Sequence, residues 1–157
     1  MKIADIPINS LIIPYCKIDV SDIAYAEYQV SVADIHRFET QYIIPKNSLV
    51  IFNTGWEKWW SQSEKYKNNY IFPTISEDAA KYLLSKEIVG LGIDTLSPDR
   101  ADSEFPVHNL LLSRGKYIIE NIANAKGIGP TGFAIALPIK IEEGTEAPIR
   151  LIGLWRD

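Results

Sequence analysis

Residues 105–121 read Phe-Pro-Val-His-Asn-Leu-Leu-Leu-Ser-Arg-Gly-Lys-Tyr-Ile-Ile-Glu-Asn, and this stretch predicts a short helix, a stop and a strand that returns beside the helix. Pro106 suits a first helical position, where its missing N–H would have no partner anyway. Gly115 suits the left-handed residue that ends a helix. The helix from His108 climbs about 10 Å, and the strand that follows covers roughly 13 Å. If the strand doubles back, Glu120 returns to the level of His108.

The facing imidazole and carboxylate would be two of the ligand types that zinc accepts. Glu120 shares one face of the expected strand with Ile118 and Ile122, where a carboxylate is costly to bury without a cation, a metal or a donor. His108 lies in the first helical turn, whose dipole disfavours imidazolium, and neutral imidazole binds metals. In the alternative interpretation, His108 is a hydrogen-bonded histidine at the core edge and Glu120 forms an ordinary ion pair. Spacing alone favours this alternative, because one histidine and one glutamate do not make a site.

The composition is that of an ordinary globular protein, with 157 residues, 46% hydrophobic and 23% charged. This length predicts a single domain. The net charge of −4 argues against general nucleic-acid binding, which requires a basic surface. The single cysteine, Cys16, excludes an intrachain disulfide. We expect no membrane span and no signal peptide, and therefore a cytoplasmic protein.

Strands and helices alternate along the sequence. Hydrophobic patterns predict strands over residues 11–20, 48–53, 88–93, 132–141 and 149–154, and helices over 32–39, 57–66 and 77–86. Such a mixture predicts an α/β or α+β protein.

Several motifs in a fixed order carry a family resemblance. They are Thr54-Gly-Trp56, Gly92-Ile-Asp94-Thr-Leu-Ser97-Pro-Asp99, Pro106-Val-His108, Ile119-Glu120-Asn121, Leu137-Pro-Ile-Lys140 and Ala147-Pro-Ile-Arg150. Together they resemble the cyclase family of metal-dependent hydrolases, which includes bacterial kynurenine formamidase (arylformamidase) and isatin hydrolase. The resemblance implies a swivelling β/β/α fold, with a mixed sheet and flanking helices, over residues 1–157 as one domain.

The resemblance also implies a site. His108 and Glu120 match two ligands of a divalent metal, zinc or manganese, while no catalytic residue is assigned. A pocket for a small-molecule substrate would include Thr54, Gly55, Trp56, Asp94 and Ser97. Taken individually, Asp94, Ser97 and Asp99 more readily fit a structural role, and core packing is the alternative for Trp56.

One family motif has no counterpart in the sequence. The main metal motif, His-x-Gly-Thr-His-x-Asp-x-Pro, precedes the region that matches residues 2–11, so we expect a chain that lacks the N-terminal quarter to third of the family. The resemblance then implies a hydrolase of amide, formamide or lactam C–N bonds whose metal site is incomplete, with weak or absent metal binding. The alternative is an inactive relative that serves as a binding or oligomerisation module. In either case we expect a homodimer or a higher homo-oligomer.

Overall fold

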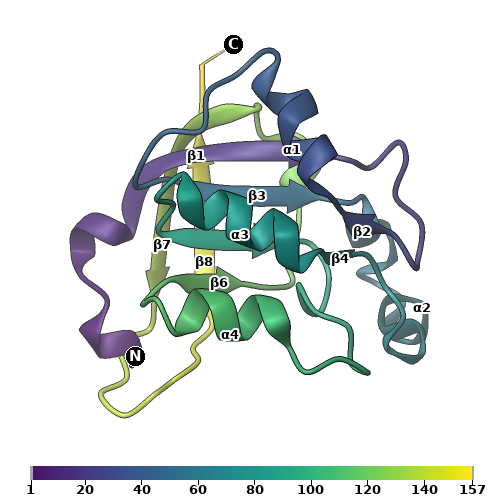
Figure 1. Ribbon diagram of the computed structural model, residues 1–157. Coiled ribbons are helices and arrows are strands. Elements are labelled where there is room, and N and C mark those ends of the chain that lie inside the picture. Colours follow the sequence, from purple (N-terminus) through teal and green to yellow (C-terminus); the bar gives the residue numbers. More distant parts are fainter. Residues whose placement is uncertain (1, 157) are drawn as a thin grey trace.

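The computed structural model describes residues 2–156, and its centre is a six-stranded mixed sheet with the strand order β6-β5-β3-β1-β7-β8 (Figure 1). The strands β1, β3, β5 and β6 run parallel, whereas β7 is antiparallel to β1 and β8 is antiparallel to β7. Their bounds are Ile12–Asp19 (β1), Leu49–Asn53 (β3), Gly90–Ile93 (β5), Tyr117–Ile119 (β6), Thr131–Pro138 (β7) and Ile149–Leu154 (β8).

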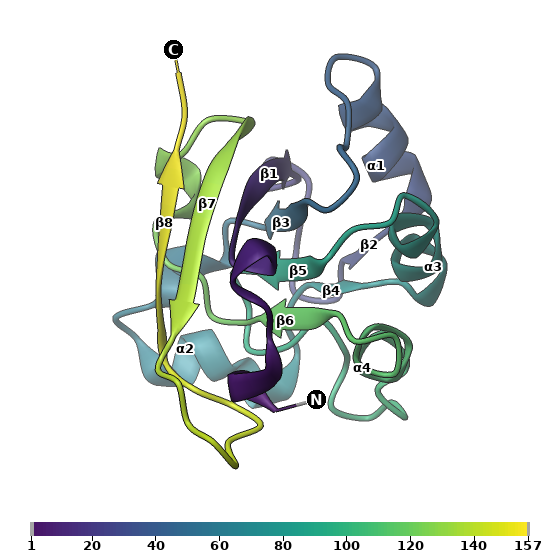
Figure 2. The ribbon, with the colours of Figure 1, turned by 90° about the vertical axis from the view of Figure 1, so that its left-hand side faces the viewer.

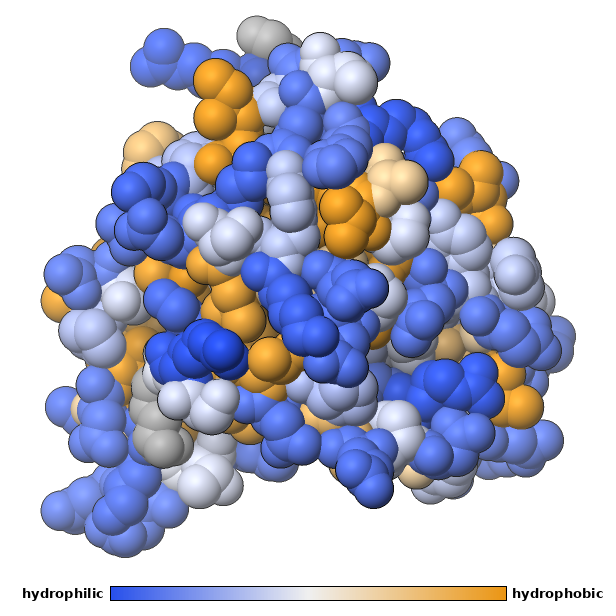
Figure 3. All heavy atoms as spheres, in the orientation of Figure 1, coloured by the Kyte–Doolittle hydropathy of each residue, from blue (hydrophilic) through white to orange (hydrophobic). Residues whose placement is uncertain are grey.

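The sheet curls so that the molecule has three layers. Figure 2 shows α1 (Val32–Glu39), α3 (Glu77–Ser85) and α4 (Pro106–Leu112) on one side of the parallel strands and the β7–β8 hairpin on the other. One hydrophobic core lies on the helix side, and a second lies between the parallel strands and the hairpin. In Figure 3 the face that carries these helices is mostly hydrophilic, with hydrophobic atoms between the charged side chains. The mixed sheet and the layer order confirm the expected α/β class and β/β/α arrangement.

Local sequence signals determine where two helices begin. At the start of α1, the Asp34 carboxylate accepts hydrogen bonds from the backbone N–H and the hydroxyl of Ser31, at 2.8 Å each. At the start of α3, the Ser76 hydroxyl accepts the Ala79 N–H at 3.1 Å. These contacts satisfy amide groups that a helix leaves without internal partners. The observed helices match the predicted 32–39 and 77–86 to within one residue.

The strand β1 tolerates a proline although it lies inside the sheet. Pairing of β1 with β3 begins only at Tyr15, one residue after Pro14. Toward β7, backbone hydrogen bonds are made by Leu11 and Lys17. Backbone groups of an antiparallel strand alternate in direction from residue to residue, so the nitrogen of Pro14 points away from β7. The missing N–H therefore removes no sheet hydrogen bond.

The helix predicted over residues 57–66 is wrong. A 3₁₀ turn at Trp56–Trp59 is followed, after an interruption, by the short helix α2 at Ser63–Lys67. The chain folds back here because Trp56 is buried against Tyr66 and Phe72, and its indole N–H donates to the Tyr66 carbonyl at 2.8 Å. Tertiary packing thus overrides helix propensity in this segment.

Short elements complete the fold. A second, two-stranded sheet pairs β2 (Gln29–Val30) with β4 (Thr74–Ile75). Further 3₁₀ turns lie at Ile3–Asp5, Ile8–Ser10, Asn68–Tyr70 and Ala125–Gly127. None of the helices in residues 2–156 combines the length and the apolar composition of a membrane span.

Candidate functional site

The imidazole of His108 is held by a carboxylate from the preceding loop. Asp99, which is 1% exposed, accepts the backbone N–H groups of Val107 and His108 at 2.9 Å each. The same carboxylate lies 2.7 Å from His108 Nδ1. Because a carboxylate only accepts, Nδ1 carries the proton and donates it to Asp99. Asp99 thus caps the start of α4 and fixes the orientation of the ring.

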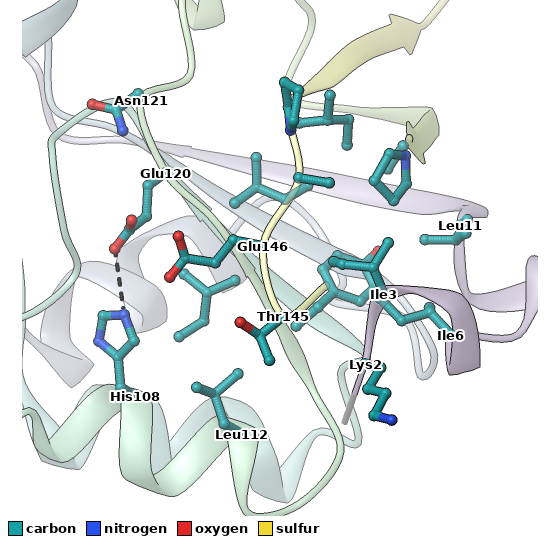
Figure 4. A pocket seen from close by; sticks show the side chains of 18 residues that line it. Lys2, Ile3, Ile6, Leu11, His108, Leu112, Glu120, Asn121, Thr145 and Glu146 are labelled. Atoms are coloured by element: carbon teal, nitrogen blue, oxygen red, sulfur yellow. Dashed lines mark ion pairs between the residues drawn. The ribbon is translucent and has the colours of Figure 1, made fainter. Parts of the chain in front are cut away.

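Glu120 follows directly after β6 and reaches the other edge of the imidazole. Its Oε1 lies 3.4 Å from His108 Nε2, and the two side chains are 31% and 28% exposed (Figure 4). The helix and the returning strand therefore bring the two groups together as their spacing predicted. One detail differs: β6 ends at Ile119 and Asn121 has a positive φ of 57°. Ile122 consequently packs in the hairpin-side core rather than on the Glu120 face.

Electrostatics favour a charged His108 ring. The hydrogen bond to Asp99, followed by the one to Glu120, raises the pKa of His108 to about 9. Burial disfavours the charge on Asp99, but hydrogen bonds from His108 and Val107 outweigh it and lower the pKa of this carboxyl. The helix dipole led us to expect a neutral imidazole, and the two carboxylates act in the opposite direction to the dipole of this seven-residue helix.

The pair fits a divalent metal in part. Two ligand atoms that each lie about 2.1 Å from a tetrahedral zinc are about 3.4 Å apart, which is the observed separation of Nε2 and Oε1. The contact between Asp99 and Nδ1 is the carboxylate–histidine arrangement that orients metal-binding histidines. Yet no group of three or more His, Cys, Asp or Glu residues that could hold a metal ion occurs among residues 2–156. The described residues thus offer two ligands, and a catalytic zinc typically has three from protein.

His108 and Glu120 lie on the wall of a cavity of about 940 Å³. Its walls come from the N-terminal turns, β6 and the loop between β7 and β8, and most of its side chains are apolar (Figure 4). The polar groups His108, Glu120 and Asn121 gather at one end, and Figure 4 shows Glu146 from the loop reaching toward them. A cavity with apolar walls and a few convergent polar groups is the usual form of a small-molecule site.

The predicted substrate-pocket residues form a separate cluster around Asp94. The Asp94 carboxylate accepts the Thr54 N–H and hydroxyl at 3.0 and 2.7 Å and the Trp56 N–H at 2.9 Å. Burial raises the pKa of Asp94, while these hydrogen bonds act in the opposite direction. Gly55, with φ of 73°, makes the turn that brings the amide groups together. Thr54, Gly55, Trp56 and Asp94 do not line the cavity that contains His108 and Glu120.

Tyr66 and Ser97 connect this cluster to the cavity. The Tyr66 hydroxyl lies 2.8 Å from the Asp94 carbonyl and 3.1 Å from Asn121 Oδ1. Ser97, also predicted for the pocket, accepts the Asp99 N–H at 3.1 Å and so shapes the loop behind His108. The sequence analysis assigned no site role to Tyr66 or Asn121. Asn121 stands in the motif Ile119-Glu120-Asn121, but only the fold brings it to the Tyr66 hydroxyl.

Comparisons with known proteins agree with this structure. A family model described as "Putative cyclase" matches residues 1–100. An isatin hydrolase from Roseibium aggregatum is 34% identical over 115 residues, which are 67% of this chain and 44% of that protein. A kynurenine formamidase from Polaromonas naphthalenivorans is 35% identical over 82 residues, which are 52% of this chain and 37% of that protein. The chain thus spans less than half of either relative.

Solved structures give a more extensive match. Isatin hydrolase A from Labrenzia aggregata, bound to benzyl benzoate, superimposes with a TM-score of 0.89 at 27% identity, over 96% of this chain and 63% of that one. The structure of a potential metal-dependent hydrolase with cyclase activity gives a TM-score of 0.76 at 29% identity, over 94% of this chain and 67% of that one.

Proposed function

The chain belongs to the cyclase family, and from this premise we propose that it is part of a metal-dependent hydrolase that opens an amide, formamide or lactam C–N bond. The observation that carries the proposal is the His108–Glu120 pair, 3.4 Å apart on the cavity wall and oriented by Asp99. We assign His108 Nε2 and Glu120 Oε1 as two metal ligands, for zinc or manganese. A metal held there would lower the pKa of a bound water and polarise the substrate carbonyl.

The remaining parts of the site act through position and polarity. Asp99 keeps the proton on Nδ1, so that Nε2 is the nitrogen that faces Glu120 and the cavity. The apolar walls favour a flat or hydrophobic substrate. Asn121 places an amide group beside Glu120, and the Tyr66 hydroxyl orients this amide group. We propose that the further metal ligands come from another polypeptide segment or a second chain, since the described residues provide two.

Calorimetric titration with Zn²⁺ and Mn²⁺ tests the ligand assignment. We expect weak binding by the chain alone, and we expect His108→Ala and Glu120→Gln to abolish it. His36→Ala is the matched control, because His36 is the second histidine of the chain and lies on the exposed side of α1. Binding that survives both site variants would disprove the assignment, whereas tight stoichiometric binding would reveal a third ligand in this chain.

Turnover tests the chemistry separately from binding. We expect little or no hydrolysis of N-formylkynurenine or isatin by the chain alone. A polypeptide that supplies further ligands should restore metal-dependent turnover. The restored activity should fall in His108→Ala by more than the roughly 10–100-fold that the loss of a group supporting a metal ligand typically costs. Efficient hydrolysis by a metal-stripped protein would contradict the proposal.

A non-enzymatic role is a second candidate, in which the chain is an inactive relative that serves as a binding or oligomerisation module. Two observations favour it: the two-ligand site and large exposed apolar side chains on the outer side of the β7–β8 hairpin. Under this alternative, no added polypeptide restores turnover.

A further inference from the structure

A second cavity, of about 360 Å³, shares no wall residue with the cavity that contains His108 and Glu120. One of its walls, residues 24–26, belongs to the loop that follows β1, and the other, within residues 56–68, belongs to the turn and the helix α2 that follow β3. Because β1 and β3 are adjacent parallel strands, this cavity lies outside their carboxyl ends, where Figure 1 shows α2. Ligand sites of parallel sheets commonly lie at this edge.

The walls of the second cavity are largely aromatic. Tyr25, which is 61% exposed, lies on the β1 side, and Trp56 and Trp59 lie on the β3 side. The Trp56 indole N–H donates to the Tyr66 carbonyl at 2.8 Å, and Trp59 packs against the cluster that Trp56 forms with Tyr66 and Phe72. These contacts fix the indole wall in place without a ligand. Such a wall offers a flat apolar surface to an aromatic ring.

Two lysines add positive charge to the aromatic wall. The Nζ of Lys65 lies 4.8 Å from the centre of the Trp59 ring, and the Nζ of Lys58 lies 5.6 Å from it. Both lysines line the cavity. An ammonium group over an indole ring is attracted by the ring electrons, so Trp59 holds two like charges together at one place.

No carboxylate neutralises these two charges. In the part of the chain from residue 2 to residue 156, neither Lys58 nor Lys65 forms a salt bridge. Four other lysines lie 2.6–2.7 Å from a carboxylate oxygen, namely Lys2, Lys46, Lys81 and Lys86. The chain has 20 acidic and 16 basic residues, so carboxylates are not in short supply. The two ammonium groups are therefore available to an anion from outside the chain.

We propose that the second cavity binds an aromatic carboxylate, with its ring against the aromatic wall and its carboxylate at the ammonium groups of Lys58 and Lys65. The cavity volume is at the small end of the roughly 300–1,000 Å³ of ligand pockets, which suits a ligand of one or two rings. Lysine binds carboxylates as a flexible point charge, so both side chains can follow the ligand. This inference is independent of the metal chemistry, because the second cavity contains neither His108 nor Glu120.

Three probes separate the ring from the charge. Benzoate has both features, acetate has the charge without the ring, and benzyl alcohol has the ring without the charge. We expect benzoate to bind, and acetate and benzyl alcohol to bind at least about tenfold more weakly.

Nuclear magnetic resonance of the indole N–H groups locates the binding. The chain has four tryptophans, of which Trp60 and Trp155 lie outside the second cavity. We expect benzoate to shift the Trp59 signal saturably and to leave the signals of Trp60 and Trp155 in place. The variant Trp59→Phe identifies the signal by its loss. No shift at Trp59, or equal shifts at all four indoles, would overturn the proposal.

A double substitution tests the two lysines. Lys58→Gln with Lys65→Gln removes both charges from the cavity and retains most of each side chain. The matched control is Lys67→Gln with Lys126→Gln, which changes the net charge equally at two exposed lysines outside the cavity. We expect the test variant to bind benzoate about tenfold more weakly and the control to bind like the unmodified chain, with unchanged circular dichroism spectra. Equal affinity of test variant and control, or binding of benzyl alcohol as tight as that of benzoate, would overturn the proposal.

Discussion

Asp94 and Asp99 are two buried carboxylates in the same segment after β5, and they differ in what they hold. Asp94 accepts hydrogen bonds from Thr54 and Trp56, whose groups do not titrate near neutral pH. Asp99 accepts two backbone N–H groups and, in addition, the Nδ1 of His108. The first carboxylate therefore holds a buried turn, whereas the second holds a titratable ring on a cavity wall. Burial does not separate the two roles, because both residues are at most 1% exposed.

The largest expected effect is on stability at Asp94. Asp94→Ala leaves the amide groups of Thr54 and Trp56 buried without partners, and we expect a loss of about 3 kcal/mol or more in the free energy of unfolding. Urea denaturation measures it, with the exposed Asp22→Asn as control. A loss below about 1 kcal/mol would show that the turn does not depend on this carboxylate.

Asp99→Asn should change both stability and the charge of His108. We expect a loss of about 2 kcal/mol together with a marked fall in the pKa of His108 from about 9, because the largest cause of its elevation is removed. Proton NMR titration reports the pKa directly, and the chain has one other histidine, His36, in the same spectrum. The control is Asp102→Asn in the same loop, whose carboxylate pairs with Arg100. If the pKa of His108 is the same in Asp99→Asn as in the wild type, Asp99 does not stabilise the charged ring.

The His108 ring should make stability depend on pH. Its folded pKa, about 9, is raised above the ordinary value of 6.5, so its contribution is complete below pH 6.5 and is lost as the pH rises through 9. Because the side chain is 28% exposed, we expect the contribution to reach only about 1–2 kcal/mol. Unfolding of the wild type and of His108→Gln across this range measures it. A constant difference between the two proteins would contradict the raised pKa.

The substitution Tyr66→Phe should have the smallest effect, because Tyr66 connects the Asp94 cluster to the cavity end that holds His108 and Glu120 and is not a central residue of either. Tyr66→Phe removes the hydroxyl between the Asp94 carbonyl and Asn121, and we expect a loss of about 1 kcal/mol. The His108 titration should stay unchanged. If that titration moves, the two clusters are coupled more strongly than the contacts indicate.

The sequence predicted most of the regular elements because their signals are local. The Ser31–Asp34 capping box determines where α1 begins, and β8 occupies the predicted residues 149–154. The segment from Trp56 to Tyr66 was mispredicted because the burial of Trp56 depends on a chain reversal that no local pattern encodes.

The candidate site was predictable only in part. The approach of His108 and Glu120 followed from helix and strand lengths within one short stretch. The control of the ring by Asp99 was not predictable, because an irregular loop separates this carboxylate from α4. Whether Asp94 faced the cavity or the interior was likewise left open by the sequence, since both arrangements place it at the end of β5.

The central claim is that His108 and Glu120, oriented by Asp99, form part of a metal site. Substoichiometric Mn²⁺ broadens the NMR signals of groups close to the bound ion, and the two histidines of the chain give the comparison directly. The account predicts that Mn²⁺ broadens the His108 ring signals while those of His36 remain sharp, and that Glu120→Gln removes the difference. Equal broadening of both rings, or none at either, would contradict it.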